Sequence, residues 1–364
     1  MKVLIAMSGG VDSGVAAYLM KQAGYECVGC TMKLYENEDA GLSKGHPCCT
    51  ADDAEDARQV AARLGIPHYD FRFTDSFRDK VIARFVDSYE QGLTPNPCLD
   101  CNRYLKFDRL WERARLLGCD ALATGHYARI AVEDGKYLLK KAVDKSKDQS
   151  YVLYFLTQEQ LSHLFFPLGD MKKTETRRLA EENGFANADK PDSQDICFVP
   201  DGKYAAAIER LTGRPAEPGD FVSPDGKVLG RHKGVIRYTI GQHKHLGLVT
   251  EEPLYVTAID ASAGTVTLDR EEGLFSREVP VTECHFISGV FPEGPIRCAA
   301  KLRYRQPEQP CLLMPMGEGS VLLRFDEPQR AATPGQAAVF YDGDVVLGGG
   351  RIAKQNNDRT EEPT

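Results

Sequence analysis

The sequence has neither an excess of positive charge nor a long apolar segment. Its formal net charge is -8 over 364 residues, so any contact with RNA would need a local basic patch rather than overall charge. No run of about 18 apolar residues is present, which argues against a membrane-spanning helix. The first stretch, MKVLIAMSGG, has only about five apolar residues before polar ones begin, so we expect no signal peptide and a cytoplasmic protein.

Cysteine, in contrast, is abundant. The chain has 11 cysteines, and in the reducing compartment expected here thiols stay free, bind metal or react. The odd count argues against a complete disulfide framework. The cysteines therefore point to metal binding or to sulfur chemistry.

The order of predicted elements indicates an α/β protein followed by β-rich units. Strands predicted at 3–7 and 26–34 alternate with helices at 14–23 and 51–65, which is typical of a doubly wound parallel sheet. After about residue 200, short alternating runs separated by Asp-Gly and Pro-Gly turns predict small antiparallel sheets. We predict a nucleotide-binding catalytic domain over 1–200, a small α+β domain over 201–278, a β-barrel over 279–354, and a disordered tail over 355–364.

The stretch AMSGGVDSGV lies between the first predicted strand and helix. It contains neither the Gly-Lys-Ser/Thr of a Walker loop nor a GxGxxG fingerprint. Adjacent glycines still let the backbone approach a ligand, and the N-terminus of the following helix suits a phosphate. Asp12 could help to hold Mg²⁺, although a turn rich in small residues is the plain alternative.

This loop resembles that of the ATP-pyrophosphatase superfamily, whose members adenylate a carbonyl oxygen. Two cysteine motifs narrow the resemblance: TPNPCLDCNRYLKF and DSQDICFVP. Together with GHYARI, KDQSYVLYFL, YTIGQHKHLGL and TPGQAAVFYDGDVVLGGGRI, they are similar to the tRNA-specific 2-thiouridylases, the MnmA (TrmU) family, from about residue 2 to about residue 353.

The resemblance implies ATP-dependent activation of the C2 oxygen of the wobble uridine, followed by sulfur transfer. Cys197 would carry a persulfide, and Cys101 would release its sulfur as sulfide or help it to attack the base. Either route leaves a transient Cys101–Cys197 disulfide, which a cellular reductant must open. The implied cofactors are ATP and Mg²⁺, with no other metal.

The resemblance also implies binding residues. Those expected at ATP are Ala6, Met7, Ser8, Gly9, Gly10, Val11, Asp12, Ser13, Met32 and Gly125. Those expected at tRNA are Asn96, Pro97, Cys98, His126, Lys147, Asp148, Gln149, Arg303, Tyr304 and Gln336. Basic clusters over 227–245 and 301–305 could neutralise backbone phosphates, or could simply be solvated faces.

The implied partners are tRNAs of the Lys, Glu and Gln types and a sulfur donor. The donor is either a cysteine desulfurase or a sulfur-relay protein, and the sequence does not choose between them. No membrane partner is expected, and the protein is expected to be a monomer.

Three alternatives stay open. Cys98 and Cys101 have zinc-ligand spacing, and Cys48 and Cys49 could complete a Cys₄ site in a zinc-knuckle RNA-binding protein. Another ATP pyrophosphatase, such as an amide-forming ligase, would not need Cys101 or Cys197. Finally, many family members have Asp where this chain has Cys98, so the identity of the general base is open, and Asp100 is expected to point elsewhere.

Overall fold

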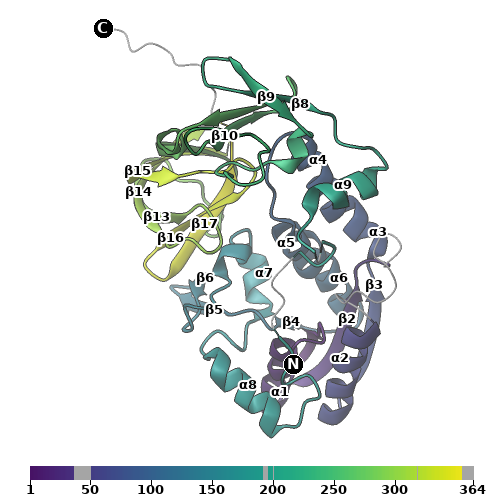
Figure 1. Ribbon diagram of the computed structural model, residues 1–364. Coiled ribbons are helices and arrows are strands. Elements are labelled where there is room, and N and C mark those ends of the chain that lie inside the picture. The colour runs from purple at the N-terminus through teal and green to yellow at the C-terminus, as the bar shows by residue number, and fades with distance from the viewer. Residues whose placement is uncertain (37–50, 192–195, 200, 318, 355–364) are drawn as a thin grey trace.

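The computed structural model describes residues 1–36, 51–191, 196–199, 201–317 and 319–354. Cys48, Cys49 and the tail predicted over 355–364 lie outside the described residues. Figure 1 shows the parallel sheet and its helices at one end of the molecule and the β-rich units at the other. Within the described ranges, no helix combines the length and apolarity needed to cross a membrane.

A five-stranded parallel sheet forms the first unit, as predicted. Its strand order is β3-β2-β1-β4-β7. The strands are β1 (Lys2–Ala6), β2 (Glu26–Lys33), β3 (His68–Arg72), β4 (Ala121–Thr124) and β7 (Leu164–Phe165). The chain moves outward from β1 to β3 and then crosses to β4 on the other side of β1. This reversal creates the crevice in which doubly wound sheets bind ligands.

Side chains of β1 alternate between two helical layers. Val3 and Ile5 pack with α1 (Val11–Gln22), α2 (Ala51–Leu64) and α8 (Lys173–Glu182). Leu4 faces the opposite layer and packs against Phe85, Leu105 and Leu110. A strand buried on both faces shows no polar alternation, which is why VLIAM reads as a continuous apolar run.

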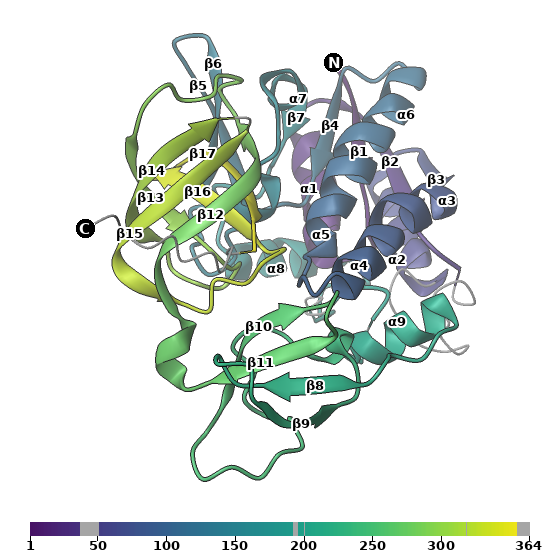
Figure 2. The ribbon, with the colours of Figure 1, turned by 90° about the horizontal axis from the view of Figure 1, so that it is seen from above.

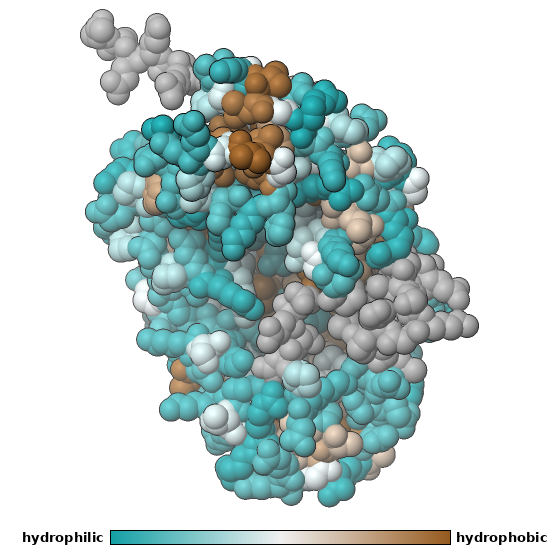
Figure 3. All heavy atoms as spheres, in the orientation of Figure 1, coloured by the Kyte–Doolittle hydropathy of each residue, from teal (hydrophilic) through white to brown (hydrophobic). Residues whose placement is uncertain are grey.

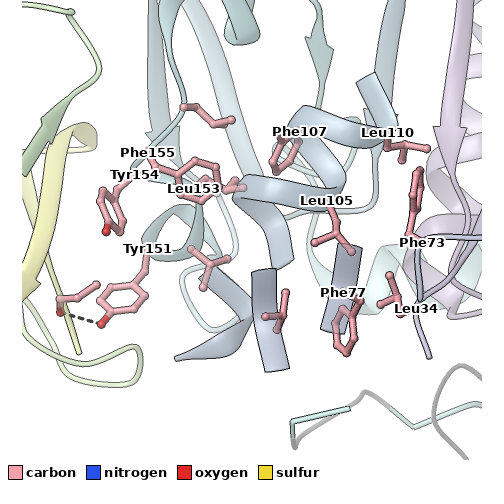
Figure 4. Close-up of a cluster of buried hydrophobic side chains, with 14 of the residues drawn as sticks. Leu34, Phe73, Phe77, Leu105, Phe107, Leu110, Tyr151, Leu153, Tyr154 and Phe155 are labelled. Atoms are coloured by element: carbon pink, nitrogen blue, oxygen red, sulfur yellow. Dashed lines mark hydrogen bonds between the residues drawn. The ribbon is translucent and has the colours of Figure 1, made fainter. Parts of the chain in front are cut away.

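The helices of the second layer carry the cysteine motif TPNPCLDCN. They are α3 (Thr74–Phe77), the π-helix η1 (Arg78–Ile82), α4 (Ala83–Glu90), α5 (Pro97–Asp100), the π-helix η2 (Cys101–Arg109) and α6 (Leu110–Leu116). Figure 4 shows Leu105, Phe107 and Leu110 of this run directed into the buried cluster that also holds Phe73 and Phe77. The remaining helices are η3 (Ser150–Leu153), α7 (Gln158–Ser162), α9 (Tyr204–Thr212), η4 (Val235–Arg237) and η5 (Glu271–Leu274).

The middle unit is a mixed four-stranded sheet in the order β10-β11-β8-β9. It comprises β8 (Gly219–Val222), β9 (Val228–His232), β10 (Tyr255–Asp260) and β11 (Thr265–Asp269), with a parallel pair between β11 and β8. Figure 2 shows this sheet beside α4, and Arg214 ion-pairs with Glu90 at 2.7 Å across the junction. Figure 3 shows a mostly hydrophilic face with one apolar group over the middle unit.

The last unit is the predicted β-barrel. Its antiparallel strands are β12 (Phe275–Phe286), β13 (Ile296–Lys301), β14 (Gln309–Gly317), β15 (Ser320–Arg330), β16 (Ala337–Asp342) and β17 (Val345–Ile352). Pairing of β12 with β17 closes the barrel. The sequence did not predict the hairpin of β5 (Ala128–Glu133) and β6 (Lys136–Lys141), which leaves the first unit and joins β17.

The barrel is docked on the first unit next to the cysteine motif. Gln336 Nε2 donates to the Thr94 carbonyl at 2.7 Å, and the Thr94 N–H donates to the Pro334 carbonyl at 2.9 Å. Tyr151 Oη donates to the Ala337 carbonyl at 2.8 Å, as the dashed line in Figure 4 shows. The turn of residues 333–336 therefore holds the segment that precedes Cys98.

Phe198 anchors the segment that contains Cys197. It is 1% exposed, and its ring meets Phe77 and Phe85 edge-on at 5.7 and 5.2 Å. Replacement Phe198→Ala is expected to lower the free energy of unfolding by about 3–5 kcal/mol, because it leaves a cavity in this cluster. Denaturant unfolding would measure the change.

The matched control is Phe275→Ala, since Phe275 is 47% exposed. It is expected to change stability by less than about 0.5 kcal/mol. Equal effects of the two substitutions would show that Phe198 is not an anchor.

Candidate active site

The loop between β1 and α1 packs closely against the first turn of α2. Gly9 has φ +78°, and a Cβ there would lie 2.1 Å from the Asp53 carbonyl oxygen, so only glycine fits. Ser13 Oγ donates to the Gly10 carbonyl at 2.9 Å and accepts from the Ser8 N–H at 3.1 Å. Helix α1 begins at Val11 without a side-chain cap, which leaves its first N–H groups for an anion.

The carboxyl end of β4 meets this loop. A Cβ on Gly125 would lie 2.9 Å from the Asp12 carbonyl carbon and the Ser13 nitrogen. Asn187 donates from Nδ2 to the Gly9 carbonyl at 2.8 Å, and its buried Oδ1 accepts no hydrogen bond from the described residues. The predicted residues from Met7 to Ser13 and Gly125 thus come together, and the spare buried acceptor fits a ligand that brings a hydroxyl or amino donor.

Asp12 is engaged by two groups that the sequence did not single out. Lys173 Nζ lies 2.7 and 2.8 Å from its two carboxylate oxygens, and Tyr127 Oη donates to Oδ1 at 2.9 Å. The stretch PLGDMKKTETRRLA contains two adjacent lysines, Lys172 and Lys173. The sequence alone does not tell which of them would contact Asp12. The fold makes that choice, because α8 packs against α1.

The cysteine motif forms a short helix that changes into a π-helix. Asn96 caps α5, and its Oδ1 accepts from the Cys98 N–H at 3.1 Å, with Pro97 as the first helical residue. Cys98 reaches the surface, whereas Cys101, which opens η2, is partly buried. π-Helical turns are rare and are frequent at functional sites.

The Asp100 carboxylate lies against Arg84. It is 8% exposed and its Oδ1 lies 3.4 Å from Arg84 Nε. Both residues line a small polar pocket closed by Glu283 and Arg351 of the barrel. Burial raises the pKa of the Asp100 carboxyl, while Arg84 opposes that shift.

Cys101 and Cys197 pack against the same hydrophobic cluster, which includes Phe77, Phe85 and Leu105. Neither cysteine forms a disulfide with another described residue, and the Cys197 carbonyl accepts a hydrogen bond of 2.7 Å from Tyr35 Oη. Two motifs far apart in the sequence are therefore anchored on one core. The described residues contain no group of three or more potential metal ligands, while Cys48 and Cys49 of the zinc alternative lie outside them.

Burial controls the acidity of the thiols. It raises the pKa of Cys101 to about 11, against a smaller lowering by Lys106 and smaller increases from Cys98 and Asp100. Crowding by protein atoms also raises the pKa of the Cys98 thiol, although that side chain reaches the surface. The described arrangement therefore favours protonated thiols at neutral pH.

His126 is a buried neutral residue in this structure. It is 7% exposed, its Nδ1 lies 2.7 Å from Thr124 Oγ1, and its ring packs against Phe107 and Phe166. Burial, and then Lys106, hold the pKa of His126 well below its ordinary value. If His126 contacts tRNA, it would do so through hydrogen bonds of its neutral ring rather than through a positive charge.

Several residues predicted to contact tRNA have contacts within the protein. Asp148 accepts from the Ala142 N–H at 3.0 Å, and Gln149 Oε1 accepts from the Tyr127 N–H at 2.9 Å. Arg303 donates to Thr333 Oγ1 at 3.0 Å. Tyr304 is 39% exposed, and burial of its hydroxyl group raises its pKa. The backbone N–H of Lys147 bonds to the Asp144 carbonyl.

The basic stretch over 227–245 is only partly available to a ligand. Lys227, Lys233 and Lys244 are exposed. His232 is 2% exposed, with Nε2 at 3.1 Å from the Gly264 carbonyl, and Arg237 ion-pairs with Glu209 at 2.5 Å. His232 therefore cannot belong to an exposed basic face, because its ring is part of the middle core.

Gly125→Ala is expected to weaken ATP binding strongly, because the new methyl group would push the backbone of the phosphate loop. Gly294→Ala is the matched control, since a Cβ there would meet no atom within 4 Å. Isothermal titration with ATP would compare the two. Equal affinities would show that ATP does not bind against this contact.

Alkylation of Cys101 by iodoacetamide is expected to keep accelerating up to about pH 11, because only the thiolate reacts. At pH 8 the native rate should be about a hundredfold below that of a thiol with the ordinary pKa of 9.0. Because the folded pKa is raised, the stability that the protonated thiol contributes should be lost as the pH rises from about 9 through about 11. A midpoint near 9 would contradict the burial of this thiol.

Comparison with known proteins places these features in one family. Residues 1–201 match the family described as tRNA methyl transferase HUP domain, 211–270 its PRC-barrel domain, and 276–352 an aminomethyltransferase β-barrel domain. A tRNA-specific 2-thiouridylase MnmA of Clostridioides difficile is 48% identical over 97% of this chain and 98% of its own length. A tRNA-specific 2-thiouridylase MnmA of Clostridium acetobutylicum is 46% identical over 96% of this chain and 99% of its own length.

Solved structures give only a distant likeness. An RNA complex of a 4-thiouridine synthetase with bound ATP has a TM-score of 0.35 and 19% identity over 58% of this chain and 50% of that one. The family assignment rests on the relatives that match this chain over nearly its full length. The chain belongs to the tRNA-specific 2-thiouridylase family.

Proposed function

We propose that this protein is an ATP-dependent tRNA 2-thiouridylase, a sulfurtransferase that converts the wobble uridine of tRNA to 2-thiouridine. The observation that carries the proposal is the 48% identity to such an enzyme over 97% of the chain. The phosphate loop and the two cysteine segments on one core supply the groups that the reaction needs.

The first step activates the base. Oxide is a poor leaving group, so the C2 oxygen of uridine attacks the α-phosphate of ATP and becomes bonded to AMP, with release of pyrophosphate. The uncapped N–H groups at the start of α1 would bind the phosphates, and Gly9 and Gly125 let the neighbouring backbone segments pack closely against this loop. Asn187 Oδ1 is a free acceptor beside the loop for a donor of the nucleotide.

Mg²⁺ would neutralise phosphate charge at this loop, and Asp12 is the carboxylate that would hold it. Asp12 is now paired with Lys173. Lys173 is therefore placed to bind a phosphate oxygen if Asp12 turns to the metal.

The second step transfers sulfur. Cys197 carries the sulfur as a persulfide, and the Cys101 thiolate attacks the Cys197 sulfur. A Cys101–Cys197 disulfide forms and hydrosulfide leaves, so two cysteine sulfurs are oxidised as the transferred sulfur is reduced. Hydrosulfide then attacks C2, AMP departs, and the remaining S–H proton is lost. In the other route, Cys101 assists direct attack by the persulfide on the base and closes the same disulfide.

The substrate and partners in this proposal are those that the family resemblance implies. The uridine must leave its stack in the anticodon loop, where extrusion costs less than in a duplex. Exposed Lys227, Lys233 and Lys244, together with Tyr304, are placed for phosphates and a base. A cysteine desulfurase or relay protein loads Cys197, and a cellular reductant reopens the disulfide of this cytoplasmic, monomeric enzyme. The tRNAs are of the Lys, Glu and Gln types.

The test is incubation with ATP, Mg²⁺, a persulfide donor and unmodified tRNA, followed by mass spectrometry of digested RNA. Cys101→Ser and Cys197→Ser are expected to abolish 2-thiouridine formation, because neither hydroxyl can carry or release sulfur. Cys119→Ala, which changes a buried cysteine outside the site, should retain activity.

Free sulfide refines the test, because it bypasses the persulfide and should restore product to Cys197→Ser. Cleavage of ATP to AMP and pyrophosphate without any change in RNA would instead favour another ATP pyrophosphatase. Full activity of both Ser variants with the persulfide donor would exclude the sulfur-transfer roles.

A further inference from the structure

Lys106 follows Cys101 by five residues on the π-helix η2. A π-helix joins residues i and i+5, so this spacing is about one turn and brings Lys106 back toward the start of the helix. Its neighbours Leu105 and Phe107 are 0% and 1% exposed and are held in the buried cluster of Figure 4. The backbone that carries Lys106 is therefore fixed.

The Lys106 residue is partly buried. Within the described ranges, it makes no ion pair or hydrogen bond, whereas Arg109 at the end of the same helix pairs with Glu112 at 3.0 Å. A lysine that no described carboxylate neutralises is available to pair with an anion that forms beside it during function.

The groups around Lys106 identify where that anion would form. The positive charge acts on Cys98, Cys101 and His126, which come from α5, η2 and the loop after β4. His126 is neutral, and the Asp100 carboxylate is paired with Arg84. Among the described groups that act on Cys101, Lys106 is the cation, while Cys98 and Asp100 oppose ionisation.

We propose that the Lys106 ammonium stabilises the sulfur anion at Cys101 during sulfur transfer, a positioning and electrostatic role that rests on the proposed function of Cys101. The attack on the Cys197 persulfide needs a thiolate at Cys101, and the proton of that thiol must first leave to solvent or a base. The positive charge of Lys106 lowers the free energy of the negative sulfur.

The test measures the thiol directly. Native wild type, Lys106→Met and Lys106→Arg would be alkylated with iodoacetamide over a pH series, with fragment-ion mapping to separate Cys101 from Cys98. Loss of the positive charge in Lys106→Met is expected to move the Cys101 midpoint up by about one pH unit, which is tenfold in thiolate at a given pH. Lys106→Arg is expected to restore most of that shift.

The matched control is Arg109→Met, which removes a charge from the same helix but lies exposed and paired with Glu112. It should leave the Cys101 midpoint unchanged. A midpoint that is equal in wild type and Lys106→Met would overturn the proposal. So would an equal shift in Arg109→Met, which would reveal a general charge effect.

The same variants separate this proposal from the proposed function. Lys106→Met should still cleave ATP and form less 2-thiouridine, with the deficit shrinking as the pH rises. A normal alkylation shift in a protein whose wild type never modifies tRNA would leave the Lys106 inference standing and reject the function. Normal modification of tRNA by wild type, with no alkylation shift in Lys106→Met, would support the function and reject the Lys106 inference.

Discussion

The site depends on one packing arrangement, the aromatic cluster that holds two distant cysteine segments. Phe198 fits edge-on against Phe77 and Phe85, and the helix that begins at Cys101 inserts Leu105 and Phe107 into the same cluster. Because protein interiors are close-packed, neither segment can shift far without opening a void. A shared core therefore keeps the Cys101 and Cys197 segments in one region.

That arrangement conflicts with reactivity, since burial disfavours the thiolate on which sulfur transfer depends. Burial dominates the raised pKa of Cys101, and a nearby ammonium only partly offsets it. The barrel contributes to the same enclosure, because its turn at residues 333–336 bonds to the segment before Cys98. Burial therefore outweighs the positive charge that η2 places near Cys101.

Much of the architecture was predictable from local signals. The parallel sheet and the barrel have the expected strand patterns, since alternation and turn residues are properties of short segments. The middle sheet was predicted to be antiparallel, but β11 and β8 pair in parallel, and that pairing joins segments about 45 residues apart, which no local turn signal encodes. Helix α1 begins at Val11 rather than Gly14, and the β5–β6 hairpin that joins β17 was not predicted. That hairpin depends on pairing with a strand far along the chain, and no local pattern encodes such a partner.

The sequence by itself determined the family, through motifs in which residue type and spacing carry the chemistry, such as the glycines of the phosphate loop and the separated cysteines. The tertiary structure decided which charges meet them. It paired Asp12 with Lys173, turned Asp100 toward Arg84, buried His126 and His232, and left Lys106 without a counter-ion among the described residues. The physical reason is that electrostatic interactions depend on distance and desolvation, and both arise only when elements remote in sequence pack together.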